Sequence, residues 1–449
     1  MAPPGIRTRG GPPGRPLIIK TNEPSHGQRG FQGVAPLGGV AGRLAPLLAK
    51  IMLGDAGAGP GALPIRVRAW DGSAVGPVGA PGFVVRHRRA LRRLLWKPGE
   101  MGLVRAYVAG ELDIDGDVFA ALGAVARVMR DGAGPIRLSG DDKRDIVRTA
   151  VTLGAVGPEP KPPPEEFAPG DRDAALAGPM REPTAFFARI LGDGLPHGIA
   201  QWDGAADLDA ADLDAAGLGA AQAAAHAAVA ERLGLVPGAR LLDLDCGWGA
   251  FARYAAAEHG ARVVGLARTS EQAAHVAALA LPNVEARGFD LDDAGDGPYD
   301  AIVGLAGIAP AHRPAARLRE LLAPGGRLVL RQPVRRPGPH PVRRTFTTGY
   351  LVPDGGEPPT LGALVDDLDE AGLDVRSVVS LRDHCARTSR AWAAGLQEHW
   401  DECETLAGAG RSRVWLLYLA ASALACESGR LGGHEISAIR LDREGRPRP

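Results

Sequence analysis

The chain has 449 residues, enough for two or three domains that each bury a core of their own. Its 52 basic and 52 acidic side chains cancel, so the overall charge gives no sign of a nucleic-acid partner. The longest apolar run, residues 414–426, is too short to cross a bilayer, and the first residues lack the apolar core of a signal peptide.

Cysteine usage points to the compartment. The four cysteines, at positions 246, 385, 403 and 426, show neither paired metal-ligand spacing nor a disulfide framework. We therefore expect a cytoplasmic protein without a metal site, and any contact with lipid to be peripheral, at the inner membrane face.

The N-terminal part of the chain changes composition twice. Residues 1–42 are rich in Gly, Pro and Arg without periodicity, which predicts a disordered tail. Residues 43–153 are predicted to form a small mixed α/β domain that starts with a helix and continues with a strand over 65–69. The apolar residues at helical spacing are Leu44, Leu47, Leu48 and Ile51. Residues 154–179 contain KPPPEEFAPG and are predicted to be a linker with little apolar surface to pack.

Residues 180–441 alternate helices and strands, which predicts an α/β domain with a doubly wound, Rossmann-like sheet, followed by a short tail over 442–449. An alanine-rich helix is expected at 218–233. The strands are expected at 239–244, 262–266, 300–305 and 327–331. In such a sheet the ligand binds at the carboxyl ends of the strands.

The sequence LLDLDCGWG, residues 241–249, is the most informative stretch. It predicts a buried strand that runs into a glycine turn at the start of a helix over 250–259, where free N–H groups hold anionic parts of a cofactor. A dinucleotide site usually has an acidic residue after the next strand, but that strand leads into Ala267-Arg268-Thr269-Ser270. Asp290 follows the third predicted strand. It either accepts a hydrogen bond from an adenine amino group or only caps a turn.

The stretch LLDLDCGWGAFARYAAAEHGARVVGLARTSEQ resembles the cofactor segment of the cyclopropane-fatty-acyl-phospholipid synthase and mycolic acid cyclopropane synthase family. Other segments agree in the family's order: ALRRLLWKPGEMGLVRAYVAGELDIDGD, YLVPDGGEPPTLG, LRDHCARTSRAW and RVWLLYLAASALACESGRLGGHE. The resemblance covers about residues 43–441 and implies an S-adenosylmethionine-dependent methyltransferase acting on double bonds in lipid acyl chains. It also implies that residues 43–153 present the lipid.

The resemblance also implies site residues. The expected cofactor-binding residues are Asp243, Asp245, Gly247, Trp248, Gly249, Gln272 and Asp290. Asp245 stands where the family has glycine, and its side chain and charge are expected to weaken cofactor binding. Replacing Asp245 with glycine is therefore expected to tighten it.

The family's bicarbonate site is not retained. Ungapped matching places Ile199, Ala309, Arg331 and Cys385 at the Cys, Glu, His and Tyr positions that grip the ion in the family. Bicarbonate is therefore not expected, and the catalytic residues stay unknown. Arg331 as a cationic clamp, and His384 or His312 as a replacement base, are the alternatives that the residues leave open.

Two functions remain open from the sequence. The first is methyl transfer to the double bond of an unsaturated acyl chain in phospholipid. Ring formation is doubtful in this case, because the residues that bind bicarbonate in the family are not retained. The alternative is a non-catalytic lipid-binding protein or a partner subunit of an active homologue, as a homodimer or heterodimer. Two segments are candidates for membrane contact: the predicted helix near Arg43 and Lys50, and the basic segment 86–93. In the alternative, the helix covers the core of the small domain and the arginines are solvated.

Overall fold

The structure is a computed structural model. It describes residues 39–53, 63, 65–131, 140–168, 180–203, 215–305, 314–338, 345–353, 358–442 and 444. Most of the two predicted tails, part of the predicted linker, Ala309 and His312 lie outside these residues.

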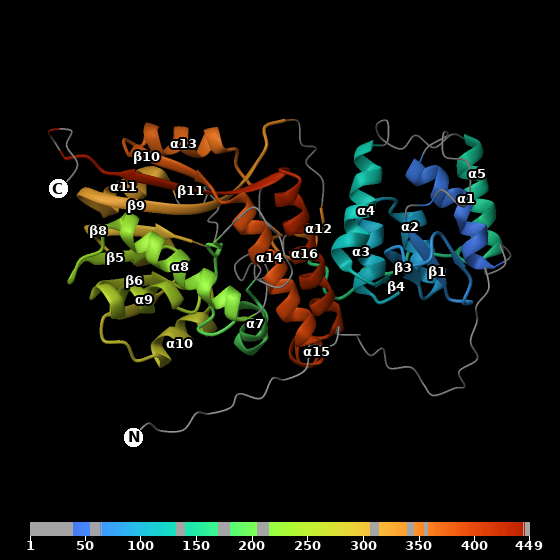
Figure 1. Ribbon diagram of the computed structural model, residues 1–449, viewed down its shortest axis with the longest axis horizontal. Helices are drawn as coiled ribbons and strands as arrows, with labels where there is room; N and C mark the ends of the chain where they lie inside the picture. The colour runs from blue at the N-terminus through green and yellow to red at the C-terminus, as the bar shows by residue number, and fades with distance from the viewer. Residues whose placement is uncertain are drawn as a thin grey trace, which may run out of the picture. The chain divides into compact units, whose positions relative to one another are not determined.

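A seven-stranded sheet carries the predicted cofactor turn (Figure 1). Its strands are β5 (Arg240–Asp243), β6 (Arg262–Leu266), β7 (Val284–Arg287), β8 (Tyr299–Gly304), β9 (Leu322–Arg335), β10 (Asp374–Ser380) and β11 (Leu431–Ile439). The order is β10-β11-β9-β8-β5-β6-β7. The strands β9, β8, β5, β6 and β7 run parallel, and β11 pairs antiparallel with β9 and with β10. The prediction of a doubly wound, Rossmann-like fold is confirmed.

The strand order places the turn after β5 at a reversal of the winding. The chain proceeds from β5 to β6 and β7 on one side, and then returns to place β8 on the other side of β5. A crevice forms at such a switch point outside the carboxyl ends of the strands, because the crossovers on the two sides diverge there. The residues of β8 are almost all buried, which explains their continuous apolar run.

Helices connect and flank these strands. They are α7 (Thr184–Leu191), α8 (Ala215–Leu233), α9 (Ala250–His259), α10 (Ser270–Ala278), the 3-10 helix η4 (Leu291–Ala294), α11 (Ala315–Leu321), α12 (Phe346–Tyr350), α13 (Leu361–Glu370), α14 (Arg382–Glu398), α15 (Trp400–Ala407) and α16 (Ala409–Glu427). The helix α9 has the predicted bounds. It ends at Gly260, whose φ of 64° lets the chain turn into β6 without a side-chain clash.

The N-terminal part contains a four-stranded sheet of order β2-β1-β3-β4. Its elements are α1 (Val40–Leu53), β1 (Arg66–Ala69), β2 (Ala74–Val75), β3 (Gly82–Val85), α2 (Arg88–Trp96), α3 (Glu100–Val108), β4 (Leu112–Asp115), α4 (Val118–Asp131) and α5 (Gly140–Thr152). Leu44 of α1 is buried and Leu48 packs against the core of this sheet. These two leucines therefore agree with the alternative in which the predicted helix covers the core of the small domain.

The arginines of the basic segment are largely paired. Arg86 binds Asp113, and both Arg89 and Arg93 contact Glu111. Ion pairs within the protein therefore hold these three arginines, although Arg89 and Arg93 share one carboxylate. No helix in the described part of the chain has the length and apolar character needed to cross a bilayer.

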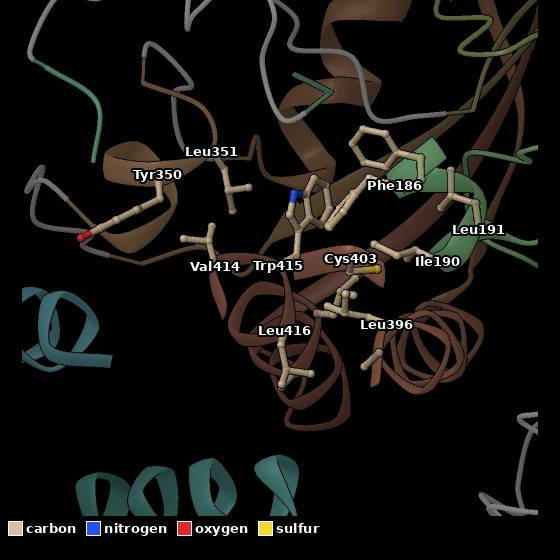
Figure 2. Packing of buried hydrophobic residues seen from close by; sticks show 14 of the residues in the cluster. Phe186, Ile190, Leu191, Tyr350, Leu351, Leu396, Cys403, Val414, Trp415 and Leu416 are labelled. Atoms are coloured by element: carbon tan, nitrogen blue, oxygen red, sulfur yellow. The ribbon is translucent and has the colours of Figure 1, made fainter. Parts of the chain in front are cut away.

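An aromatic and aliphatic core joins α7, α14, α15 and α16 (Figure 2). The Phe187 ring lies 5.3 Å from Trp415 in an edge-to-face arrangement and 4.9 Å from Trp248. Edge-to-face aromatic pairs contribute energy beyond their buried area. The indole of Trp248 thus belongs to this core although its backbone lies in the glycine turn.

Residues 154–168 of the predicted linker make packing and hydrogen-bond contacts that their composition did not indicate. Phe167 is buried, and its N–H donates to the carbonyl of Gly349 at 2.8 Å. Glu166 accepts from Arg105 Nε of α3 at 2.7 Å and from the Tyr350 hydroxyl of α12 at 3.2 Å. One phenylalanine and one carboxylate therefore fix a segment that is otherwise rich in proline.

Candidate cofactor and acyl-chain site

The turn after β5 has the backbone geometry of a ligand-binding loop. Gly247 has φ 54° and Gly249 has φ 81°, values that side-chain-bearing residues rarely adopt. Leu244 N–H donates to Val303 of β8, and Cys246 N–H donates to Leu266 of β6. The turn is thereby held at the switch point, and α9 begins immediately after it with N–H groups that lack helical partners.

The helix α10 closes one side of the turn. A Cβ on Gly249 would lie 3.0 Å from a methyl carbon of Val276, a tight contact, and the φ of 81° favours glycine there. Gln272 forms a capping box with Thr269 at the start of α10 and is buried. Its Nε2 has no hydrogen-bond partner among the described residues. This buried donor is available to a ligand.

Asp245 does not stand as an isolated charge. Its Oδ2 lies 2.6 Å from Arg268 Nη2, and the Arg268 guanidinium lies 4.1 Å from the centre of the Phe289 ring. The carboxylate is buried and the arginine side chain is 17% exposed. The carboxylate charge is therefore paired with Arg268, and the expectation that Asp245 weakens cofactor binding stays a prediction.

Asp243 ends β5 beneath this pair. It is buried, and its Oδ1 accepts a 3.4 Å hydrogen bond from the Asp245 N–H. Burial, and next the charge of Asp245, raise the pKa of Asp243 to about 7. Near neutral pH the protonated and ionised forms of this carboxyl group are therefore both populated.

Two of the predicted cofactor residues are placed differently. The Trp248 Nε1 donates to Thr184 Oγ1 at 2.9 Å, and its ring packs in the aromatic core. Its side chain thus supports the turn from the core. Asp290 is exposed and precedes η4, but its carboxylate makes no capping hydrogen bond. The alternative in which the Asp290 side chain only caps a turn is therefore wrong.

Three of the four positions matched to the bicarbonate site come together. Arg331 Nη1 donates to the Ile199 carbonyl at 2.7 Å. A Cβ on Gly433 would lie 2.5 Å from Ile199 Cδ1 and 3.5 Å from Cys385 Cβ. Ala309 lies outside the described residues.

Arg331 is not a free cationic clamp. It is buried, and its Nη2 lies 2.9 Å from Glu435 Oε2, while Glu435 also forms an ion pair with Arg232. Arg331 therefore shares one carboxylate of β11 with Arg232, and its guanidinium is held by this ion pair. Burial lowers the pKa of Arg331.

His384 and Cys385 have other partners. His384 Nδ1 accepts from the Trp202 N–H at 3.0 Å. The Cys385 and Cys426 sulfur atoms lie 3.1 Å apart, across the contact of α14 with α16. Cys385 is therefore one of a thiol pair, which its isolated position in the sequence did not indicate.

A pocket lies beside the turn at the carboxyl ends of the strands. Its lining includes His197, Ile199, Gln222, His226, Leu305 and Arg331. His226 comes from α8, and its pKa falls to about 4, chiefly through burial and then through Arg331. Sequence reasoning missed His197, His226 and Arg268. The first two lie in weakly patterned or alanine-rich stretches, but the position of Arg268 directly after β6 offered a signal.

Comparison with known proteins identifies the relatives. The profile of the family described as mycolic acid cyclopropane synthetase matches residues 184–436. This range is more than half of the chain. The chain belongs to the mycolic acid cyclopropane synthetase family. The resemblance stated from the sequence is thus confirmed.

Individual relatives extend the match. A probable fatty acid methyltransferase of Mycobacterium tuberculosis is 31% identical over 421 residues, covering 85% of this chain and 92% of the relative. A probable fatty acid methyltransferase of Pseudomonas putida is 28% identical over 403 residues, covering 84% and 92%. The solved cyclopropane synthase MmaA2 of Mycobacterium tuberculosis superposes with a TM-score of 0.52 and 25% identity, over 60% of this chain and 98% of that structure.

Members of the mycolic acid cyclopropane synthetase family are S-adenosylmethionine-dependent methyltransferases that act on lipid and fatty acid substrates, and S-adenosylmethionine is the cofactor. The residues present fit this molecule. Gly247 and Gly249 allow a close backbone approach, and the buried Nε2 of Gln272 lacks a partner within the described part of the chain. Asp245 is the departure, and its charge is already balanced.

Proposed function

We propose that the protein transfers the methyl group of S-adenosylmethionine to the double bond of an unsaturated acyl chain in phospholipid. The observation that carries this proposal is the glycine turn at the switch point, within residues 184–436 that match the family profile. The small pocket beside it has Ile199, Leu305 and Ala225 in its lining together with the polar His197, His226 and Arg331. The same pocket is bordered by His197, which contacts the turn.

In this proposal the backbone of the turn and the start of α9 bind the cofactor. Gln272 would donate to it through Nε2, Asp243 and the Asp245–Arg268 pair would border it, and Asp290 would face the adenine from the mouth of the site. Trp248 holds the turn from the core. The cofactor supplies an electrophilic methyl group, and the residues of this chain position the alkene and receive the proton that leaves.

Ring closure through bicarbonate has little support from the chain. An anion next to Ile199 would meet an apolar side chain, and Arg331 already binds Glu435. A methyl or methylene branch is therefore the product we propose. For lipid access, we propose that residues 43–153 bring the protein to the inner membrane face by peripheral contact.

The second candidate is a non-catalytic lipid-binding or partner subunit, in a homodimer or heterodimer. It is favoured by Asp245, whose side chain enters a turn that the family keeps as glycine. Calorimetric titration with S-adenosylmethionine separates the two functions. Micromolar binding, followed by methyl transfer from labelled cofactor to vesicles of unsaturated phosphatidylethanolamine, supports the enzyme. The absence of binding at millimolar cofactor supports the partner subunit.

A further inference from the structure

We propose that His197 is the proton acceptor of the reaction, in place of the bicarbonate that the family's matched positions no longer hold. The inference rests on the proposed methyl transfer and assigns a catalytic residue to it. It is carried by the position of one imidazole between the cofactor turn and the acyl pocket.

The geometry places His197 against the turn. A Cβ on Gly247 would lie 3.5 Å from His197 Cβ and 3.9 Å from its Nδ1. The ring is edge-to-face with Trp248, with centroids 6.4 Å apart. The same residue lines the pocket with Ile199 and Arg331. His197 therefore lies near Gly247 and Trp248 of the turn and also lines the pocket in which we propose that the alkene is held.

The ring nitrogen is available. His197 Nδ1 is buried and has no hydrogen-bond partner among the described residues. A buried nitrogen without a partner is costly for stability, so its retention at a site is explained by a ligand or reacting group. By contrast, His384 uses its Nδ1 to accept from the Trp202 N–H.

The surroundings favour a neutral imidazole that gains a proton only transiently. Burial lowers the pKa of His197, Asp245 acts to raise it, and Arg268 acts to lower it. The pocket also presents Arg331 from β9 and His226 from α8. A base must be neutral before the reaction, and the net effect of burial, Asp245 and Arg268 keeps the pKa of His197 below its ordinary value.

The chemical step balances with these groups. The alkene electron pair forms a carbon–carbon bond with the transferred methyl carbon, the bond from that carbon to sulfur breaks, and the sulfur keeps that electron pair as a thioether. The acyl chain becomes a carbocation. A neighbouring C–H bond then breaks, its electrons form a new double bond, and its proton moves to the His197 ring nitrogen. The proton then passes to solvent.

The experiment uses the full chain with three variants: His197→Gln, His197→Gly and His226→Gln. We expect His197→Gln to lower methyl transfer to unsaturated phospholipid vesicles by about 10²–10⁴-fold. Calorimetric affinity for S-adenosylhomocysteine should change less than about threefold. Added imidazole should restore His197→Gly in proportion to the neutral imidazole present. His226→Gln is the comparison, because it removes a second histidine from the lining of the same pocket and should lower methyl transfer less than His197→Gln does.

A second readout does not depend on activity. Nitrogen-15 NMR of the ring of His197, assigned by its loss in the variant, should show a neutral imidazole at pH 7 in the full chain. A charged ring at pH 7, or wild-type turnover in His197→Gln, would overturn the inference. A larger loss in His226→Gln than in His197→Gln would also overturn it. If the unchanged protein binds the cofactor but methylates no lipid, the proposed function fails and the base fails with it.

Discussion

At the scale of single residues, the Asp245–Arg268 ion pair alters the expected effect of the Asp245→Gly substitution on stability and on cofactor binding. Asp245→Gly alone leaves Arg268 without its 2.6 Å partner beside Phe289. Removing one member of a buried ion pair lowers the free energy of unfolding by about 3–5 kcal/mol when the other member stays buried. Because Arg268 is partly exposed, we expect Asp245→Gly to lower it by about 1–3 kcal/mol. The expectation that glycine simply tightens cofactor binding therefore applies to the double variant.

The measurement is a double-mutant cycle with Asp245→Gly, Arg268→Leu and both together, followed by urea unfolding and calorimetric titration with S-adenosylmethionine. We expect a coupling energy of about 1–3 kcal/mol and the tightest binding in the double variant. Additive losses in stability would contradict a functional ion pair.

The raised pKa of Asp243 predicts a dependence of stability on pH. Its pKa is about 7 in the folded protein against an ordinary value of 3.8, so the folded state binds more protons than the unfolded chain between these values. The free energy of unfolding should therefore fall as pH rises from about 4 to about 7, by on the order of 4 kcal/mol from this group.

Asp243→Asn tests this assignment. The amide oxygen can still accept from the Asp245 N–H, but it cannot ionise. We expect the variant to match the unchanged protein near pH 5 and to exceed it in stability at pH 8, in urea unfolding at each pH. An unchanged pH profile would show that Asp243 is ionised normally.

At the scale of helices and strands, the contact of α14 with α16 brings two thiols to 3.1 Å. A disulfide needs about 2.05 Å between sulfurs, so only a small approach is required. Hydrogen peroxide, a two-electron oxidant, should convert the pair to a disulfide with two waters released, and the chain mass should fall by about 2 Da.

Thiol titration and intact mass measure this oxidation. Two of the four thiols should disappear, and Cys385→Ser should prevent this loss of mass while leaving the buried Cys246 and Cys403 reduced. Four thiols after treatment would show that the two helices hold the sulfurs apart.

The same scale explains which features were predictable from the sequence. Strand β5, the glycine turn and α9 depend on a local apolar run, two glycines and a short helix pattern, so they were placed within a residue or two. The role of the Trp248 side chain depends on Phe187 and Trp415, far away in the chain, and no local pattern reveals it. The pairing of Asp245 with Arg268 likewise requires β5 and β6 to be adjacent.

At the scale of the whole molecule, Glu166 joins segments that are distant in sequence. It is buried and binds Arg105 of α3 and Tyr350 of α12. Glu166→Gln leaves Arg105 with only its 3.2 Å ion pair to the half-exposed Glu159, and we expect a loss of about 1–3 kcal/mol in unfolding free energy. Asp145→Asn is the matched control, because its ion pair with Arg148 is exposed and should contribute less than about 0.5 kcal/mol. Equal effects in urea unfolding would contradict the joining role of Glu166.

The Asp245–Arg268 pair also constrains the order in which the chain acquired its two residues. An aspartate introduced first at a buried turn would place an uncompensated charge there, whereas an arginine introduced first has the Phe289 face and partial exposure to accommodate it. A chain with glycine at 245 and arginine at 268 should therefore lose less stability than a chain with aspartate at 245 and an apolar residue at 268. A path of single substitutions that passes through the arginine first would thus cross the smaller loss.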